Sequence, residues 1–165
     1  MIIYEEMLRA FQKEKIKYAL VGGLAVNLLG SLRNTADMDI VVEMSDENLS
    51  KIVTVLKKQG YRVKQPVDPM SIADADTRAY WIEKKHMKAF NFYKEAELKE
   101  VDIIIETPRP YDKIKKRLVR IKSKDINIPV IGINDLIAMK ENTGREIDAR
   151  DIGELKRIKK LKKIR

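Results

Sequence analysis

Two aspartates stand one residue apart at the head of an apolar segment, and a third lies inside another apolar segment. The first segment is DMDIVVE, which carries Asp37 and Asp39, and the second is VDIII, which carries Asp102. Residues two apart in a strand point to the same face, so Asp37 and Asp39 would place their carboxylates side by side. Carboxylates held close together raise each other's pKa, and a divalent metal ion is the simplest compensation. If the strand of Asp102 lies beside residues 37–42, the three acids can hold two metal ions for phosphoryl displacement.

The composition limits which metal could bind. The 165 residues include no cysteine and one histidine, His86. Thiolate chemistry, disulfides and clusters of histidine ligands are therefore excluded, and any metal must be held by oxygen. Oxygen ligands favour Mg²⁺, Mn²⁺ or Ca²⁺. A second Asp-x-Asp pair, Asp74 and Asp76, lies among small residues without apolar strand neighbours, so we do not assign it to the site.

A diglycine precedes the aspartate pair by about fifteen residues. Gly22 and Gly23 follow the apolar run KYALV and precede the short helical pattern LAVNLL. Glycines at such a junction bare backbone N–H groups and let phosphate oxygens approach closely. A plain strand-to-helix turn would use the same residues. Their position ahead of the acids makes them candidates for binding a triphosphate.

The spacing of apolar residues predicts the elements that must position these groups. Ser45, followed by two acids, is expected to cap a helix that ends near Lys58. Residues 65–78 are expected to form a helix or a loop that crosses the molecule. The other predicted helices are 3–14, 24–29, a short one ending at Arg117, 133–141 and 146–163, and the strands are 17–22, 37–43, 61–64, the hairpin 88–93 with 100–106, 118–123 and 126–131.

This order of elements indicates an α+β fold, a mixed sheet flanked by helices with further helices at the C-terminus. The repeated βα units of a doubly wound fold are missing. We expect one domain, with a core of residues 1–132 and a C-terminal helical segment of residues 133–165 packed on it.

The net charge of +9 is concentrated at the C-terminus. Seven of the 34 Lys and Arg residues lie in 155–165 without any acid, which leaves 27 bases against 25 acids in residues 1–154. These bases could form the solvated face of a helix whose buried stripe includes Leu155, Ile158 and Leu161. They could also contact a polyanion such as RNA.

The N-terminus has acids in its first turns and no apolar run long enough for a signal peptide. No stretch approaches the length of a membrane span. We therefore expect a soluble, cytoplasmic protein.

The succession GG, LLG and DMD resembles the first motif of the nucleotidyltransferase (DNA polymerase beta-like) superfamily. Asp102, in a later strand, matches the third acid of that superfamily. Residues 136–155, LIAMKENTGREIDARDIGEL, resemble the C-terminal segment of small prokaryotic nucleotidyltransferases related to abortive-infection toxins. The matching residues there are Lys140, Arg145, Arg150 and Asp151.

The resemblance implies a fold of the nucleotidyltransferase type and an activity that releases pyrophosphate from an NTP such as ATP. Asp37, Asp39 and Asp102 would be both the catalytic residues and the ligands of Mg²⁺ or Mn²⁺. Gly22 and Gly23 would bind the triphosphate, and Lys140 and Arg33 would be further nucleotide contacts. Many relatives have Gly-Ser where this chain has Gly22-Gly23, so their hydroxyl contact to phosphate is absent here.

The acceptor of the nucleotide is left open by these residues, and RNA, a protein and a small molecule are all candidates. One alternative function is an idle module of the same fold that only binds nucleotide or a partner. Another is a toxin component that pairs with an antitoxin-type protein. At the level of single residues, Lys140 and Arg145 could be plain surface charges. Asp148 and Asp151 could form internal salt bridges with Arg145 and Arg150.

Overall fold

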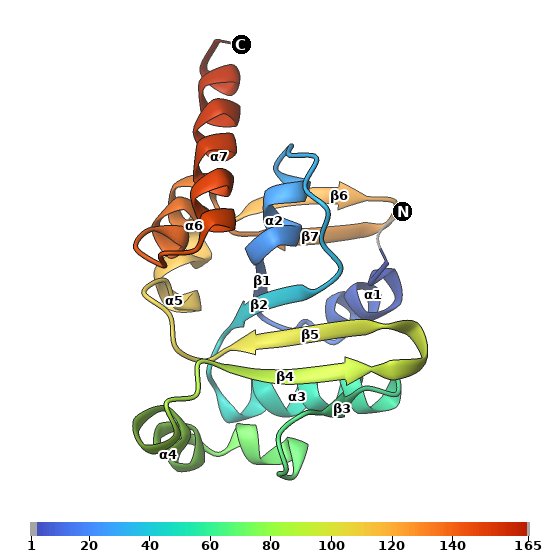
Figure 1. Ribbon diagram of the computed structural model, residues 1–165. Helices are drawn as coiled ribbons and strands as arrows, with labels where there is room; N and C mark the ends of the chain where they lie inside the picture. The colour runs from blue at the N-terminus through green and yellow to red at the C-terminus, as the bar shows by residue number, and fades with distance from the viewer. Residues whose placement is uncertain (1–2, 165) are drawn as a thin grey trace.

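The computed structural model describes residues 3–164 as a seven-stranded mixed sheet with helices on both faces (Figure 1). The strand order is β3-β4-β5-β2-β1-β7-β6. The predicted α+β class is confirmed. The boundary expected at residue 132 stays a prediction, because nothing in the packing of the described residues tests it.

The elements follow the predicted order closely. The strands are β1 (Tyr18–Val21), β2 (Met38–Val42), β3 (Arg62–Val63), β4 (Ala89–Lys94), β5 (Lys99–Ile104), β6 (Val119–Ser123) and β7 (Ile126–Val130). The α-helices are α1 (Glu5–Lys13), α2 (Gly22–Leu28), α3 (Asp46–Lys58), α4 (Ala75–Lys85), α5 (Tyr111–Ile114), α6 (Ile133–Lys140) and α7 (Glu146–Ile164), with 3₁₀ turns at Pro69–Ala73, Glu95–Glu97 and Lys115–Arg117.

The middle of the sheet carries the predicted aspartates. Strand β2 runs parallel to β5 and antiparallel to β1. In this register Asp39 pairs with Asp102 on one side and with Val21, the last residue of β1, on the other. Gly22 follows Val21 directly, so the glycine turn and both acids meet at one place in the sheet.

The two faces of the central strands differ in burial. Met38, Ile40, Val101 and Ile103 are fully buried and form the core under α1 and α3. Figure 1 shows these two helices behind the sheet and α2 in front of it. The residues that alternate with them, Asp39 and Asp102, point to the opposite face, where they are only partly covered. Because alternate side chains of β2 and β5 point to opposite faces of the sheet, one face forms the core and the other carries the aspartates.

Three predicted elements differ in detail. Helix α2 begins at Gly22, so the diglycine forms its first turn and does not precede it. The strand expected at 61–64 is only two residues long. Residues 65–78 hold a 3₁₀ turn and the start of α4, whose N-cap is Asp74, with a side chain that accepts a hydrogen bond from Thr77 N. The Ser45 cap of α3 is confirmed, since its side chain accepts a hydrogen bond from Asn48 N.

Helix α7 leaves the body of the protein near its end. Leu155 and Ile158 are buried, but Leu161, the next residue of the same stripe, is 51% exposed. Figure 1 shows the last turns of α7 extending away from the sheet. The basic segment is therefore largely solvated as far as residue 163, and Arg165 lies outside the described residues. Within residues 3–164, no helix combines the length and the apolar character needed to cross a membrane.

Candidate active site

Asp39 and Asp102 form the centre of the site. They are direct neighbours across the parallel β2–β5 pairing, and their carboxyl groups are within hydrogen-bonding reach of each other. Burial, together with the charge of Asp102, raises the pKa of Asp39 from 3.8 to about 7. Burial also raises the pKa of Asp102. Near neutral pH the two groups therefore share a proton unless a cation takes its place.

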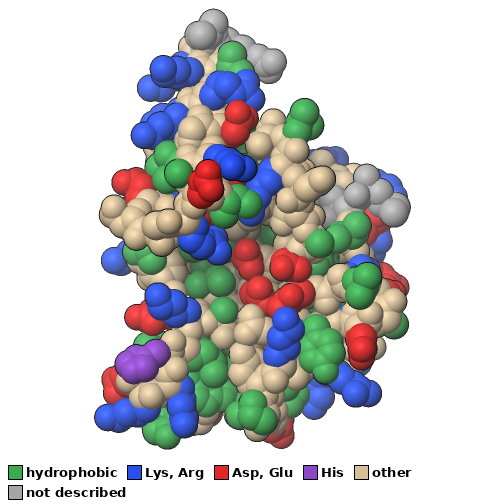
Figure 2. All heavy atoms as spheres, viewed as in Figure 1, with side chains coloured by type: hydrophobic (Ala, Val, Ile, Leu, Met, Phe, Trp, Pro, Cys, Tyr) green, Lys and Arg blue, Asp and Glu red, His purple; other side chains and the backbone are tan. Residues whose placement is uncertain are grey.

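Asp37 and a fourth acid, Glu100, lie beside this pair. Asp37 is exposed just before β2, and burial and then the charge of Glu100 raise its pKa. Glu100 stands two residues before Asp102, on the same face of β5, and forms an ion pair with Lys64. Figure 2 shows acidic side chains gathered around a hollow in this face of the molecule.

The acids do not yet form a closed metal site. In residues 3–164 no three acidic or histidine side chains are arranged closely enough to hold a metal ion. The structure brings Asp39 and Asp102 together and leaves Asp37 near them on the surface. Metal binding would require the exposed Asp37 side chain to turn toward the pair, so the assignment of all three as metal ligands stays a prediction.

The glycine turn lies against Asp39. Gly22 has a φ of +67°, which L side chains rarely adopt, and a Cβ atom there would overlap the Asp39 carboxylate. A Cβ atom at Gly23 would lie 2.8 Å from Nη1 of Arg33. Gly22 therefore requires glycine for its backbone conformation and its contact with Asp39, whereas a side chain at Gly23 would have to displace the end of the Arg33 side chain. Phosphate binding by Gly22 and Gly23 stays a prediction.

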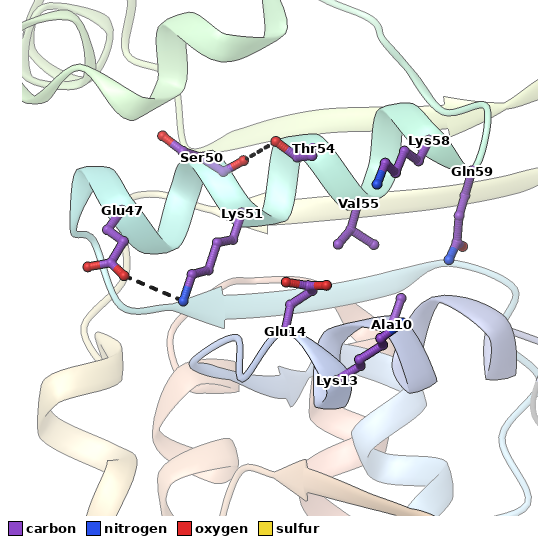
Figure 3. Close-up of a pocket in the computed structure, with 10 residues that line it drawn as sticks. All are labelled: Ala10, Lys13, Glu14, Glu47, Ser50, Lys51, Thr54, Val55, Lys58 and Gln59. Carbon is purple, nitrogen blue, oxygen red and sulfur yellow. Dashed lines mark hydrogen bonds and ion pairs between the residues drawn. The ribbon is translucent and has the colours of Figure 1, made fainter.

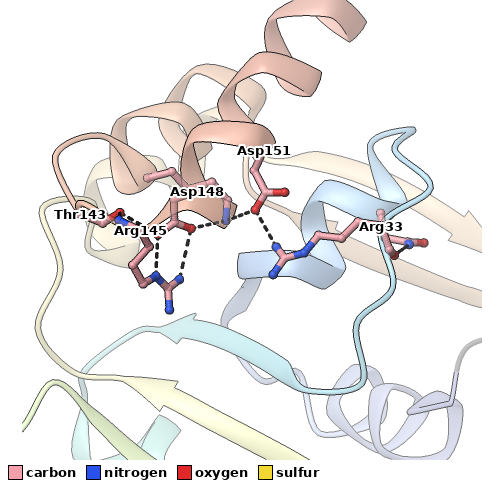
Figure 4. A network of polar contacts seen from close by, with 7 residues as sticks. Arg33, Thr143, Arg145, Asp148 and Asp151 are labelled. Atoms are coloured by element: carbon pink, nitrogen blue, oxygen red, sulfur yellow. Dashed lines mark hydrogen bonds and ion pairs between the residues drawn. The ribbon is translucent and has the colours of Figure 1, made fainter.

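Arg33 and Lys140 meet at one carboxylate (Figure 4). Oδ2 of Asp151 accepts hydrogen bonds from Nη1 of Arg33 at 2.6 Å and from Nζ of Lys140 at 2.8 Å. Lys140 also contacts Asp148 at 3.2 Å, and its side chain is only 7% exposed. Both cations lie near the aspartates, but their charges are already compensated. Their predicted contact with nucleotide is untested.

The ion pairs of the C-terminal segment differ in part from those expected. Arg145 pairs with Asp148 as expected, with 2.7 Å between Nε and Oδ2. Arg150 does not pair with Asp151. It contacts Glu146 on the outer face of α7, because residues four apart on a helix share a face.

Sequence reasoning missed several residues that support the site. Nδ2 of Asn91 on β4 donates to Oδ1 of Asp102 at 2.6 Å, and Asn91 is itself held by Gln65 at 2.7 Å. The buried Tyr4 hydroxyl lies 2.5 Å from the carbonyl oxygen of Ala36 and accepts a hydrogen bond from Glu100 N. Burial raises the pKa of Tyr4 to about 12. Tyr4 thereby ties the start of β2 to β5, and no local pattern in the sequence indicates this.

Two hollows lie in different places relative to the acids. A groove of about 490 Å³ between α1 and α3 is lined by helix side chains such as Lys13, Lys51 and Val55 (Figure 3). It lies on the side of the sheet away from the carboxylates. A pocket of about 280 Å³ opens directly beside Gly22 and Asp39. The second pocket is therefore the candidate substrate site.

A mixed sheet that pairs two carboxylates on adjacent parallel strands, with a glycine turn packed against one of them, is a nucleotidyltransferase fold, and the family match agrees with this class. The particular family follows from the sequence. The chain belongs to the aminoglycoside-2''-adenylyltransferase family, and the match covers residues 4–158. No curated protein matches the chain.

Three solved structures share the fold. The lincosamide antibiotic adenylyltransferase LnuA, solved with lincomycin, has a TM-score of 0.61 and 22% identity over 92% of this chain and 93% of its own. ANT(2'')-Ia in complex with adenylyl-2''-tobramycin has a TM-score of 0.55 and 13% identity over 96% of this chain and 92% of its own. An antigenic nucleotidyltransferase-like protein from Paracoccidioides brasiliensis has a TM-score of 0.52 and 16% identity over 92% and 75%. At these identities the likeness concerns the fold alone.

Proposed function

We propose that this enzyme transfers the adenylyl group of ATP to a hydroxyl of a small, positively charged acceptor of the aminoglycoside kind. The observation that carries the proposal is the Asp39–Asp102 pair on adjacent strands, where burial and then the neighbouring acids raise the pKa of both carboxyl groups. The family match supports adenylyl transfer. The additional acid Glu100 supports a cationic acceptor, since an ammonium group of an amino sugar could take the place of its present partner Lys64.

The residues present fit a hard divalent cation. Asp37, Asp39 and Asp102 offer only oxygen donors, which Mg²⁺ and Mn²⁺ prefer. Held by these three acids, the ion would neutralise phosphate charge as it builds up during transfer. The raised pKa of Asp39 and Asp102 means that two ionised carboxylates are unfavourable there, and a bound cation would compensate their charge.

The transfer itself needs one proton acceptor and correct orientation. The acceptor oxygen forms a bond to the α-phosphorus, and the bond from that phosphorus to the bridging oxygen breaks, so that pyrophosphate leaves with the electron pair. We assign the hydroxyl proton to the Asp102 carboxylate. The hydrogen bond that Asn91 donates to Oδ1 fixes the orientation of the Asp102 carboxylate for this role.

A labelling assay tests this function. The protein is incubated with Mg²⁺, ATP labelled at the α-phosphate and separate acceptors, namely aminoglycosides, lincomycin, total RNA and total protein. We expect label on an aminoglycoside and loss of transfer by about 100-fold or more in Asp39→Asn. Asp76→Asn, which changes an exposed acid of the other Asp-x-Asp pair, should behave like the parent.

The same assay separates the alternatives. Label on RNA or protein would mean that the acceptor is a macromolecule, which contradicts a small acceptor and favours the alternative of a toxin component. Binding of ATP without any transfer or pyrophosphate release would indicate an idle module and would refute the proposed activity. A cytoplasmic location also stays a prediction.

A further inference from the structure

The pocket beside Asp39 has one apolar and one cationic side. Ile104, Leu136 and Met139 form the apolar wall. Lys140, Thr143, Arg145 and Asp148 form the polar wall, where α6 ends and α7 begins. The pocket thus joins the carboxylate pair to the start of α7.

Three of the cations near the carboxylates, those on the side of α7, differ in exposure. The Lys140 side chain is 7% exposed and the Arg33 side chain 21%, whereas the Arg145 side chain is 69% exposed. The Lys140 ammonium uses two of its three N–H groups on Asp148 and Asp151 and is almost fully covered, so a ligand in the pocket reaches it less easily than it reaches an exposed cation. Arg145 is therefore the cation of this group that a ligand in the pocket can reach.

Arg145 is held in place by one edge of its guanidinium group. Nε and Nη2 contact the Asp148 carboxylate at 2.7 and 3.2 Å. Asp148 is itself only 2% exposed and also accepts a hydrogen bond from Thr143 at 2.7 Å. No acceptor for Nη1 of Arg145 is found among residues 3–164, and Figure 4 shows the guanidinium group pointing from α7 toward β2. The free edge is thus oriented toward the carboxylate side of the pocket.

The electrostatics indicate what the free edge would bind. The hydrogen bonds and the charge of Asp148 raise the pKa of Arg145 most, and the charge of Asp39, which lines the same pocket, adds to this effect. Bound metal would remove much of the negative charge that Arg145 now faces, and the outer phosphates of a nucleotide would restore it. A guanidinium group with a fixed orientation suits phosphate oxygens better than a mobile ammonium does.

We propose that Arg145, positioned by Asp148, contacts the β- and γ-phosphates of the bound nucleotide. This inference rests on the proposed function, because it assumes that the α-phosphate lies at the aspartates. It changes the expectation for Lys140, which becomes a residue that supports Asp148 and Asp151.

Binding measurements in Mg²⁺ test the proposal on four proteins: the parent, Arg145→Gln, Arg145→Lys and Arg150→Gln. The ligands are a non-hydrolysable ATP analogue, inorganic tripolyphosphate and AMP. We expect Arg145→Gln to weaken binding of the ATP analogue and of tripolyphosphate by about 10- to 100-fold and to leave AMP binding unchanged. Arg145→Lys keeps the charge and the pairing with Asp148, so its affinity for the ATP analogue and tripolyphosphate should lie between those of the parent and Arg145→Gln. Arg150→Gln is the matched control, since Arg150 lies one to two turns along α7 with its charge paired to Glu146.

The outcomes are distinct. If Arg145→Gln binds tripolyphosphate as tightly as the parent does, or if AMP binding falls equally, the proposal is overturned while the transfer activity stands. If the parent binds neither the ATP analogue nor tripolyphosphate, the proposed function fails and this inference fails with it. If Arg145→Gln does not fold, Arg145→Lys provides the test. Unchanged affinity of that variant for the ATP analogue and tripolyphosphate would contradict a contact that depends on the planar guanidinium group.

Discussion

The acidity of Asp39 is the most distinctive property of the site at the residue scale. Its carboxyl group lies in the sheet next to Asp102, with Gly22 packed against it, and its pKa is about 7. A carboxylate in such a place destabilises the folded state unless something compensates its charge. The uncompensated negative charge of Asp39 and Asp102 also favours the binding of a divalent cation.

Asp39→Asn should therefore stabilise the metal-free protein at alkaline pH. The pKa of Asp39 is raised in the folded state, so its contribution to stability is fully present below pH 3.8 and is lost as the pH rises through about 7. At pH 8 we expect the free energy of unfolding of the variant to exceed that of the parent by on the order of 2 kcal/mol, and at pH 4 to differ little. Denaturant unfolding at the two pH values measures this.

Saturating Mg²⁺ with a non-hydrolysable ATP analogue should reverse the order at pH 8. Ligands that bind only the folded state stabilise it, and the variant lacks the carboxylate that holds them. If the free energy of unfolding of metal-free Asp39→Asn depends on pH as that of the parent does, the pKa of the Asp39 carboxyl group is not raised by folding.

At the element scale, α7 is joined to the core by buried charges. Asp148 and Asp151 lie one turn apart on α7, and they hold Lys140 of α6 and Arg33 of the loop before β2. Burial alone would raise the pKa of Asp148, but hydrogen bonds from Arg145, Thr143 and Lys140 keep it well below its ordinary value. The network therefore sets the position of α7, and of Arg145 with it, relative to the aspartates.

Lys140→Met should be strongly destabilising, since it removes a buried cation from two carboxylates. We expect a loss of about 3 kcal/mol in the free energy of unfolding, measured in urea at pH 7. Lys156→Met is the matched control, since Lys156 lies on the exposed face of α7. It should change the free energy of unfolding by less than about 0.5 kcal/mol. A Lys140 variant as stable as the parent would show that the network does not hold α7.

The sequence predicted the centre of the site better than its surroundings. Asp39 and Asp102 could be placed because each lies in an apolar run with a period of two, and their strands proved to be neighbours. The contact of Arg33 with Asp151 joins residues 118 positions apart, and Tyr4 reaches Glu100 across 96 positions. Such contacts depend on how elements pack and leave no periodic signal. For the same reason, the sequence does not reveal the buried ion pairs of Lys140 with Asp148 and Asp151, and the predicted contact of Lys140 with nucleotide stays a prediction.

On the scale of the whole molecule, an acidic cluster and a basic segment lie apart. Four acids, Asp37, Asp39, Glu100 and Asp102, lie beside one another at β2 and β5, and a run of bases without acids lies on the projecting end of α7 (Figure 2). Leu161 is half exposed there, so the helix end is held only through the turns before it. Contact of this end with a polyanion stays a prediction.

Replacing Lys159, Lys160, Lys162 and Lys163 by Gln should leave nucleotide and metal binding unchanged, because these residues follow the last buried residue of α7, Ile158. Lys159 also donates a hydrogen bond to Oδ1 of Asn134 on α6. Stability should change by less than about 0.5 kcal/mol for each exposed position. If the tail contacts RNA, the variant should bind RNA more weakly and with a flatter dependence on salt, since fewer counterions are released. Filter binding at several salt concentrations measures both. Equal RNA binding by the two proteins, or none by either, would make the tail a solvated helix face.

Anomalous diffraction from crystals grown with Mn²⁺ and a non-hydrolysable ATP analogue tests the central claim most directly, because it locates the metal without assuming a reaction. We predict Mn²⁺ bound by the carboxylates of Asp37, Asp39 and Asp102, with the Asp37 side chain turned toward the pair and the α-phosphate of the analogue on the same ion. Mn²⁺ elsewhere, or a nucleotide bound away from the Gly22 turn, would contradict the account.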